Sequence, residues 1–254
     1  MRPTERDIAP SMIQRVSEVL KAFHFGDYSL TVTEIAKRSN LPKSTTARIV
    51  TEMIRFGLLE RDNQKVQLGI RLFELGQIAT RSMNLRQFTF QAMQQLSIAT
   101  GQTVHLAVLE GTEVVYVQIL RSKTAPKLPS RVGGRMPAYA TGVGKVLLAY
   151  APAETLDELR ETKFEKYGPN TAGSLKDLEP QLAEIREKRL GFEHEESAAN
   201  VACAAAPIIH NGKTIAAISV SVSTDIGDVT KMGPAVSAVA RSLSRGTTKM
   251  SQSA

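Results

Sequence analysis

The chain offers one thiol for nucleophilic chemistry. Cys203 is the single cysteine among 254 residues, so no disulfide can form within the chain, and a reducing cytosol fits. A catalytic cysteine needs a histidine and an acidic group that orients it. His194 and Glu193 precede Cys203 in the sequence, but nothing ties their geometry to the thiol. Because Cys203 begins an apolar segment, we expect a thiol packed in the core.

The sequence contains no complete motif for binding a metal ion or a nucleotide. The four histidines, at positions 24, 105, 194 and 210, are far apart, so we expect no metal ion and no other cofactor. Thr141-Gly142-Val143-Gly144-Lys145 precedes a predicted helix, where backbone N–H groups can bind a carboxylate or a phosphate. It is not a P-loop, because Tyr139 stands in place of a glycine and Val146 in place of Ser or Thr. Tight helix packing is the interpretation we favour for these glycines.

A strand that carries hydroxyl groups could line a ligand cavity. Within Ile215–Ser223, strand alternation places Ser219 and Ser221 on the same face. Small hydroxyls beside small apolar side chains suit a small polar ligand. A sheet face open to water gives the same alternation, and periodicity alone favours that second interpretation.

Positive charge is concentrated near the N-terminus. The net formal charge is +7. Residues 37–55 contain five basic side chains and a single acidic one, Glu52. Clustered basic charge is the footprint of a surface that binds phosphate, although a solvated helix face gives the same count.

The elements that carry this charge fit a helix-turn-helix. Residues 11–23 repeat apolar side chains on one helical face. Thr31 and Glu34 form a capping box before a short helix over 32–38, and a second helix follows a tight turn and runs over 42–56. Two helices joined in this way, with basic residues on the second, are typical of DNA-binding proteins.

The second helix divides into a buried and an exposed face, as a recognition helix requires. We expect the inward face to consist of Ala47, Val50, Met53 and Ile54. Residues near the helix start are placed to meet base edges and phosphates. We expect these DNA contacts from Lys43, Ser44, Thr45, Thr46 and Arg48.

A short hairpin completes the first domain. Strands over 58–61 and 65–68 predict a wing, and the helix over 70–82 has no partner in so small a domain, which makes it the expected connector. The expected regions are a winged helix-turn-helix DNA-binding domain (1–68), a linker helix (69–84), a second domain (85–246) and a disordered tail (247–254).

The second domain predicts an α+β fold. Strands over 103–109 and 114–120 form one hairpin and strands over 204–209 and 214–223 form another, so we expect an antiparallel sheet with helices packed on it. Residues 121–140 show no clear period. The expected helices lie over 85–100, 141–150, 152–161, 175–189 and 228–245.

Several short motifs occur in the order and spacing of one known family. They are Thr33-Glu34-Ile35-Ala36, Leu41-Pro42-Lys43-Ser44-Thr45, Gly57-Leu58-Leu59, Leu68-Gly69, Leu75-Gly76, Arg131-Val132-Gly133, Ala140-Thr141-Gly142-Val143-Gly144-Lys145-Val146-Leu147-Leu148 and Cys203-Ala204-Ala205-Ala206-Pro207. Over about residues 11–245 the chain therefore resembles the isocitrate lyase regulator (IclR) family of bacterial transcription factors. The resemblance implies a winged helix, a linker helix, a C-terminal effector domain with a GAF/PAS-like sheet, and dimers or dimers of dimers.

The resemblance also implies an effector site that holds small carboxylates or aromatic acids. Two positions depart from the family pattern. Position 193 is often Asp, and the longer Glu193 would shrink the pocket or change its charge. Position 200 is often Gly, so Asn200 puts the shape of the adjoining loop in doubt. The matching pocket positions are Leu128, Met136, Gly142, Val143, Glu193, Val201, Cys203, Ser219 and Ser221.

Together these patterns predict a cytoplasmic transcription regulator. We expect a homodimer or dimer of dimers that reads an inverted-repeat operator in double-stranded DNA, and whose operator affinity is set by a small organic or aromatic acid or a related amide. The sequence has no apolar run of 18 residues and no secretory signal in its first ten residues, so we expect no membrane partner. Two alternatives stay open. One is an enzyme that acts on a small acid and carries an accessory DNA-binding domain, although no catalytic constellation is complete. The other is a winged helix used only for protein assembly.

Overall fold

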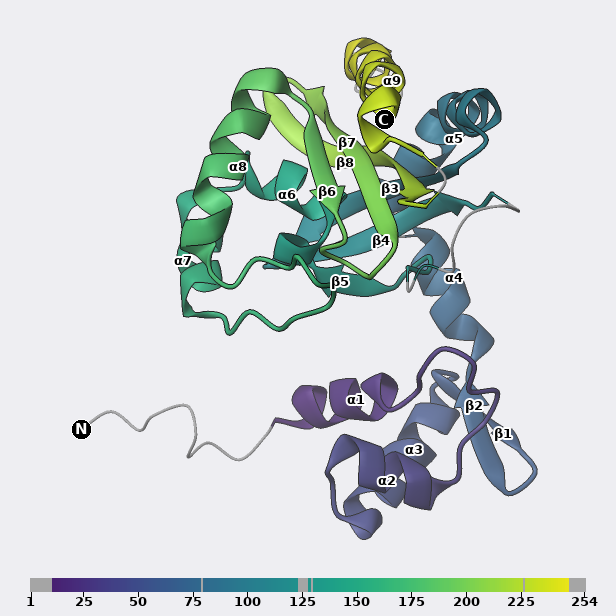
Figure 1. Cartoon of the computed structure of the whole chain (residues 1–254). Helices are drawn as coiled ribbons and strands as arrows, with labels where there is room; N and C mark the ends of the chain where they lie inside the picture. Colours follow the sequence, from purple (N-terminus) through teal and green to yellow (C-terminus); the bar gives the residue numbers. More distant parts are fainter. Residues whose placement is uncertain (1–10, 79, 123–127, 129, 226, 247–254) are drawn as a thin grey trace. The chain divides into compact units, whose positions relative to one another are not determined.

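The computed structural model describes residues 11–78, 80–122, 128, 130–225 and 227–246. The chain divides into two compact units, Met1–Thr80 and Arg81–Ala254, which are coloured along the sequence in Figure 1. The division falls inside the region 69–84 that the sequence assigns to a linker. The expected disordered tail, 247–254, lies outside the described residues.

The first unit is a winged helix-turn-helix, as predicted. Its hairpin is antiparallel and pairs Leu59 with Leu68. An apolar core of nine buried residues, which includes Val19, Ile35 and Val66, joins the helices to the hairpin. The elements are α1 (Met12–Lys21), α2 (Val32–Ser39), α3 (Lys43–Arg55), β1 (Leu59–Asp62), β2 (Lys65–Leu68) and α4 (Ile70–Ile78).

Local capping fixes the helix-turn-helix. The Thr31 hydroxyl accepts a hydrogen bond from the Glu34 N–H, and the Glu34 carboxylate accepts one from the Thr31 N–H, which confirms the capping box. Asn40 ends α2 with a φ of 52°, a left-handed conformation that Asn tolerates better than most residues. Pro42 is the N-cap of α3 rather than its first helical residue.

The inward face of α3 differs in part from the prediction. Val50 and Met53 are buried as expected, but Ala47 is exposed, and Ile49 and Thr46 are buried. A helical face is about 100° wide, so periodicity leaves the residues at its margins undecided. Packing of α3 against α1, α2 and β1 decides which of them are buried.

The linker region is helical on both sides of residue 79, which lies outside the described residues. The helix expected over 70–82 ends as α4 at Ile78, and the next helix, α5 (Thr80–Thr100), begins five residues earlier than position 85. None of the residues of α4 is buried.

The second unit is built on a six-stranded antiparallel sheet with the strand order β5-β4-β3-β8-β7-β6, which confirms the predicted fold class. Both predicted hairpins are present, and Asn211-Gly212 forms the turn of the second one with positive φ angles. The strands are β3 (Thr103–Glu110), β4 (Glu113–Leu120), β5 (Arg135–Pro137), β6 (Gly191–His194), β7 (Val201–His210) and β8 (Lys213–Ser223).

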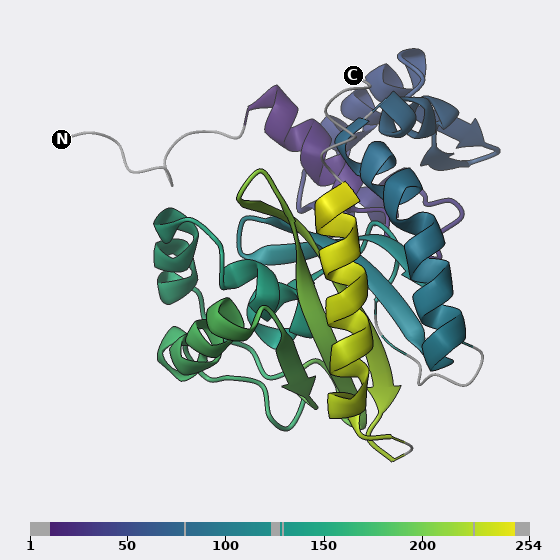
Figure 2. The same cartoon turned by 90° about the horizontal axis from the view of Figure 1, so that it is seen from above.

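Helices cover both faces of this sheet. Figures 1 and 2 show α5 and α9 on one face and α6, α7 and α8 on the other. Strand alternation divides the core accordingly: Ile218 and Val220 pack with α5 and α9, whereas Ala217 and Ala205 pack with α6. The remaining helices are η2 (Ala138–Ala140), α6 (Gly142–Leu148), α7 (Ala153–Glu161), α8 (Leu175–Lys188), η3 (Val229–Met232) and α9 (Gly233–Gly246).

The sequence patterns miss two short strands and misplace two boundaries. β5 and β6, of three and four residues, form the edges of the sheet. Arg189, with a φ of 52°, ends α8 before Gly191. The helix expected over 228–245 begins as the separate turn η3. No helix among the described residues is long and apolar enough to span a membrane.

Candidate functional site

Helix α6 lies unusually close to its neighbours in the second unit. A Cβ atom on Gly144 would lie 2.1 Å from the Ala138 carbonyl oxygen, and one on Gly142 would lie 3.0 Å from the Cys203 Cβ. These contacts confirm that the glycines serve tight packing. The Gly144 N–H donates to the Thr141 hydroxyl, so this donor is not directed at a ligand.

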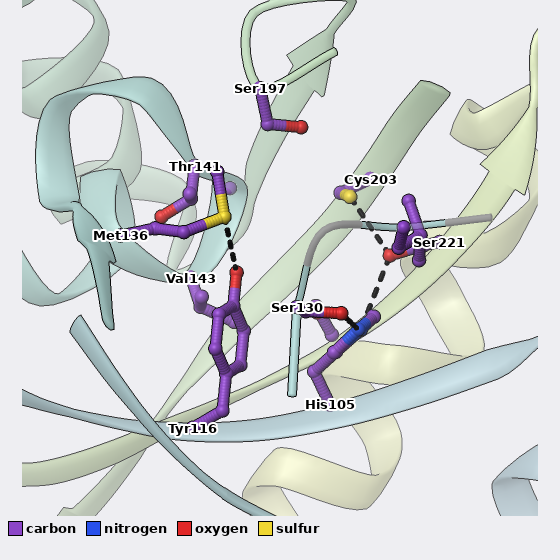
Figure 3. A pocket seen from close by; sticks show the side chains of 12 residues that line it. His105, Tyr116, Ser130, Met136, Thr141, Val143, Ser197, Cys203 and Ser221 are labelled. Carbon is purple, nitrogen blue, oxygen red and sulfur yellow. Dashed lines mark hydrogen bonds between the residues drawn. The ribbon is translucent and has the colours of Figure 1, made fainter. Parts of the chain in front are cut away.

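A small pocket lies between the start of α6 and the sheet (Figure 3). Its volume is about 20 Å³, which is room for about one water molecule. Side chains from β3, β4, β7 and β8 form its floor. The lining residues are His105, Tyr116, Leu128, Ser130, Met136, Thr141, Gly142, Val143, Ser197, Cys203, Ser219 and Ser221.

Sheet register brings the polar floor together. Cys203 pairs with Ser221, and His105 pairs with Ser219. Paired residues on neighbouring strands project from the same face. Ser219 and Ser221 are 2% and 1% exposed, so this face is buried and not open to water.

A chain of hydrogen bonds runs across the floor (Figure 3). His105 Nε2 lies 2.9 Å from Ser130 Oγ, and His105 Nδ1 lies 3.3 Å from Ser221 Oγ. Ser221 Oγ in turn lies 3.0 Å from Cys203 Sγ. Burial lowers the pKa of His105 to about 3, and the positive charge of Arg121 adds to the shift. The imidazole is therefore neutral, with one donor and one acceptor nitrogen.

Tyr116 forms an aromatic wall. Its ring centroid is 5.3 Å from that of His105, and its hydroxyl donates to Met136 Sδ at 3.6 Å. Burial raises the pKa of Tyr116, so the phenol remains protonated and can donate a hydrogen bond.

Glu193 is fully buried beside this floor but does not line the pocket. It pairs with Cys203 across β6 and β7. Its Oε1 accepts hydrogen bonds from the backbone N–H groups of Glu196, at 2.6 Å, and Ser197, at 3.0 Å. The carboxylate thus holds the turn that presents Ser197 to the pocket. Burial raises the pKa of Glu193, and the hydrogen bonds from that turn offset part of the shift.

Asn200 lies in the segment between β6 and β7. This residue has a φ of 60°, a left-handed conformation that glycine adopts freely and that Asn tolerates. The backbone at position 200 is therefore in a region that glycine also adopts readily.

A buried ion pair supports the same turn from α6. Lys145 is fully buried, and its Nζ donates to Glu196 Oε1 at 2.5 Å and to Gln181 Oε1 at 2.7 Å. A buried lysine requires such partners, because an uncompensated charge in the interior is strongly destabilising.

The structure brings together most of the residues that the resemblance assigns to an effector site. Glu193 does not line the pocket, and neither does Val201, which is buried at the start of β7. The seven that do are Leu128, Met136, Gly142, Val143, Cys203, Ser219 and Ser221.

Sequence analysis missed five lining residues. For His105 and Tyr116 a signal was present, because both lie in predicted strands and alternation assigns them to a face. Ser130 and Ser197 lie in segments without regular structure, where no period places them. Thr141 was recognised only as part of a glycine-rich motif.

The thiol does not have the environment of a nucleophile. Burial raises the pKa of Cys203 well above its usual value, whereas a nucleophilic cysteine needs a stabilised thiolate. His194 is exposed while its neighbour Glu193 is buried, and successive strand residues point to opposite faces.

Four of the five expected DNA contacts remain accessible on α3. Lys43, Ser44 and Arg48 are exposed, and Thr45 is half-buried. The prediction for Thr46 is wrong. Its side chain is buried, and its hydroxyl donates to the Pro42 carbonyl at 3.1 Å, so it stabilises the first turn of the helix instead.

A winged helix-turn-helix with an exposed basic helix, followed by a sheet domain with a buried polar pocket, defines the architecture of a DNA-binding regulator. Comparisons with known proteins agree. Residues 12–63 match the IclR helix-turn-helix domain, and residues 77–245 match the C-terminal domain of bacterial transcriptional regulators of the IclR type. The chain belongs to the IclR family of DNA-binding transcriptional regulators.

Named relatives are transcriptional regulators. XynR of Escherichia coli is 34% identical over 216 residues, which cover 84% of this chain and 86% of XynR. KdgR of Dickeya chrysanthemi is 33% identical over 218 residues, which cover 82% and 72%. An IclR homolog from Microbacterium hydrocarbonoxydans, solved in complex with 4-hydroxybenzoate, matches with a TM-score of 0.85 and 31% identity over 92% of this chain and 98% of that one.

Proposed function

We propose that a small organic acid, or a related amide, binds the pocket of the second unit and controls the affinity of the first unit for its operator. The observation that carries this proposal is a buried pocket with many hydroxyl groups in a chain that also contains a DNA-binding unit. The similarity to a homolog solved with 4-hydroxybenzoate supports the ligand class.

The chemistry of the lining favours a ligand that accepts hydrogen bonds. Ser219 and Ser221 offer hydroxyl groups, and Tyr116 and Met136 offer an apolar wall. The Ser197 hydroxyl also lines the pocket and donates to Glu193 Oε1 at 3.3 Å. The pocket volume of about 20 Å³ is far below the several hundred Å³ of typical ligand sites. Binding therefore requires the walls to separate, and this movement is a source of the conformational change that a regulator needs.

Thermodynamic linkage explains how effector binding can change the affinity for the operator. An effector changes operator affinity only as far as it binds one arrangement of the protein better than another. The linker region 69–84 connects the two units along the chain, so we propose that the arrangement of the DNA-binding units changes through it.

The enzyme alternative is not favoured by the thiol, whose raised pKa opposes a thiolate. The protein-assembly alternative predicts no binding to promoter DNA, so the DNA measurements below test it directly.

Arg48 is the residue on α3 that we expect to read a base. It is exposed in the N-terminal half of the helix, and an Arg–guanine contact contributes about 1–3 kcal/mol. Arg48→Ala should weaken operator binding roughly 5–150-fold at matched salt, measured by fluorescence anisotropy with the promoter beside the gene. Lys21→Ala removes an exposed cation of α1 and serves as the control. Equal affinity of Arg48→Ala and wild type would contradict the assignment.

Two copies of the chain should read an inverted repeat. In α4, Ile70, Phe73 and Ile78 are 63%, 62% and 69% exposed, and a second copy can cover such an apolar face. Light scattering of the full chain should show a dimer or tetramer. A footprint should protect half-sites whose centres are separated by whole helical turns of about 34–36 Å. A monomer at micromolar concentration, or protection of a single half-site, would refute this proposal.

Ser219 and Ser221 should contribute directly to effector affinity. The double variant Ser219→Ala/Ser221→Ala removes two buried hydroxyl donors, each about 0.5–1.5 kcal/mol in a typical hydrogen bond. Calorimetry with a panel of small acids should show a loss of roughly 5- to 150-fold. Ser242→Ala, on the exposed side of α9, is the control. If a cognate acid binds all three proteins equally, this face is not the site.

A further inference from the structure

The pocket that we propose for an acid has no cation in its lining. Among the twelve described residues that form it, none is Lys or Arg. His105 is neutral because burial lowers its pKa to about 3, and both of its ring nitrogens already face hydroxyl groups. A carboxylate placed here meets hydroxyl dipoles but no opposite charge, and burying an unpaired anion is costly.

A second carboxyl group lies directly behind the pocket. Glu193 is 0% exposed and pairs with the lining residue Cys203. A Cβ atom on the lining residue Gly142 would lie 3.4 Å from the Glu193 Cβ. A ligand carboxylate in the pocket would lie close to the Glu193 carboxylate. The two cannot both remain ionised without a large cost in free energy, because like charges in a buried site raise each other's pKa.

The groups around Glu193 do not neutralise it. Lys145 of α6 is a buried cation whose charge acts on Cys203, but its ammonium group donates to Glu196 and Gln181. Cys203 of β7 and Tyr116 of β4 are neutral because burial raises their pKa values. The neutral thiol of Cys203 interacts with the Glu193 carboxyl group as a hydrogen-bond donor and offsets part of the rise in the pKa of Glu193, but it carries no charge that could neutralise it. The carboxylate of Glu196, in the turn after β6, raises the pKa of Glu193 further.

One oxygen of Glu193 is available for a proton. Oε1 accepts the hydrogen bonds of the turn, whereas Oε2 is buried with no hydrogen-bond partner among the described residues. An ionised oxygen without a partner in the interior is less favourable than a neutral carboxylic acid. Protonation at Oε2 therefore removes charge without disturbing the bonds that hold the turn.

Resting on the function proposed above, we propose that a carboxylate effector binds together with one proton, which Glu193 takes up from solvent at Oε2. Glu193 thus changes the affinity for the acid relative to the amide without contacting the ligand. The effector acid enters as an anion, Glu193 becomes neutral, and the net charge of the buried cluster is unchanged. The amide of the same acid carries no charge, so it binds without a proton.

The direction of the pH dependence follows from this exchange. The pKa of Glu193 is raised in the free protein and rises further when an anion binds beside it. Between these two pKa values the affinity for the acid falls up to tenfold for each unit of pH increase. Below the lower value Glu193 is already neutral, and the affinity is flat. The affinity for the amide is flat throughout.

Calorimetry in pairs of buffers that differ in ionisation enthalpy measures the number of protons taken up. The full chain is titrated with benzoate, 4-hydroxybenzoate, acetate and lactate, and then with the amide of the tightest-binding acid, between about pH 5 and pH 8, where a raised glutamate titrates. Wild type should take up as much as one proton with the acid and none with the amide.

Two variants locate the proton. Glu193→Gln keeps an oxygen for the turn and places an amide nitrogen at the unpartnered position, so uptake should vanish and acid affinity should become independent of pH. Glu195→Gln makes the same change two residues away, where Oε1 accepts from the Asn200 N–H, and should behave as wild type.

The outcomes separate this inference from the function on which it rests. Acid binding by wild type without proton uptake overturns the role of Glu193 and leaves the proposed effector site standing. Uptake that persists in Glu193→Gln also overturns it, since the proton then resides on the acid, on His105 or on Glu196, whose Oε2 is also buried with no hydrogen-bond partner among the described residues. If Glu193→Gln does not fold, equal uptake with acid and amide by wild type is the refuting result. If no acid binds, the proposed function itself fails.

Discussion

The approach of α6 to η2 and the sheet is the contact on which the rest of the second unit depends. No Cβ atom fits on Gly144 against the Ala138 carbonyl, and the sheet beneath α6 offers small side chains such as Ala205 and Ala217. Helix and sheet therefore meet almost at backbone distance. This closeness places Thr141 and Gly142 over Cys203 and leaves a narrow polar space between them, which is the pocket.

The same closeness accounts for the buried charges. Lys145 follows Gly144 on the helix that lies against the sheet, so its ammonium group has no path to solvent and must find partners inside. The backbone N–H of its partner Glu196 donates to Glu193 Oε1, so both buried carboxyl groups belong to the same turn. Buried ionic groups rarely increase stability over apolar replacements. Here the buried ionic groups fix the turn that carries Ser197. The shape of the pocket wall therefore depends on the charge state of Glu193.

The sequence predicts the fold wherever a local interaction decides it. The capping box of Thr31 and Glu34 and the turn at Asn211-Gly212 are each specified by a few adjacent residues, and both form as predicted. The short edge strands β5 and β6 were missed, because three or four residues are too few for alternation to be recognised. β5 pairs with β4, from which residues 121–134 separate it, and β6 pairs with β7, which follows it after a short turn.

Prediction of the functional site from the sequence has the same limit. Ser219 and Ser221 could be assigned to one face from alternation, but whether that face met water or a helix depended on α6, which no strand pattern contains. Thr46 was expected on the DNA-facing side and is buried, because its position at the margin of the helix face is decided by tertiary packing. The absence of cations from the described pocket lining, and the position of Glu193 behind it, emerge only from the three-dimensional register.

The central claim is that backbone-level packing of α6 builds this unit, and thermal unfolding of Gly144→Ala tests it most directly. The added methyl group must displace the Ala138 backbone, and overpacking of this kind costs about 1–3 kcal/mol. The melting temperature should fall by roughly 2–12 °C. Gly227→Ala, where nothing lies within 4 Å of the new Cβ, should have the same melting temperature as wild type. A Gly144→Ala protein as stable as wild type would contradict the account.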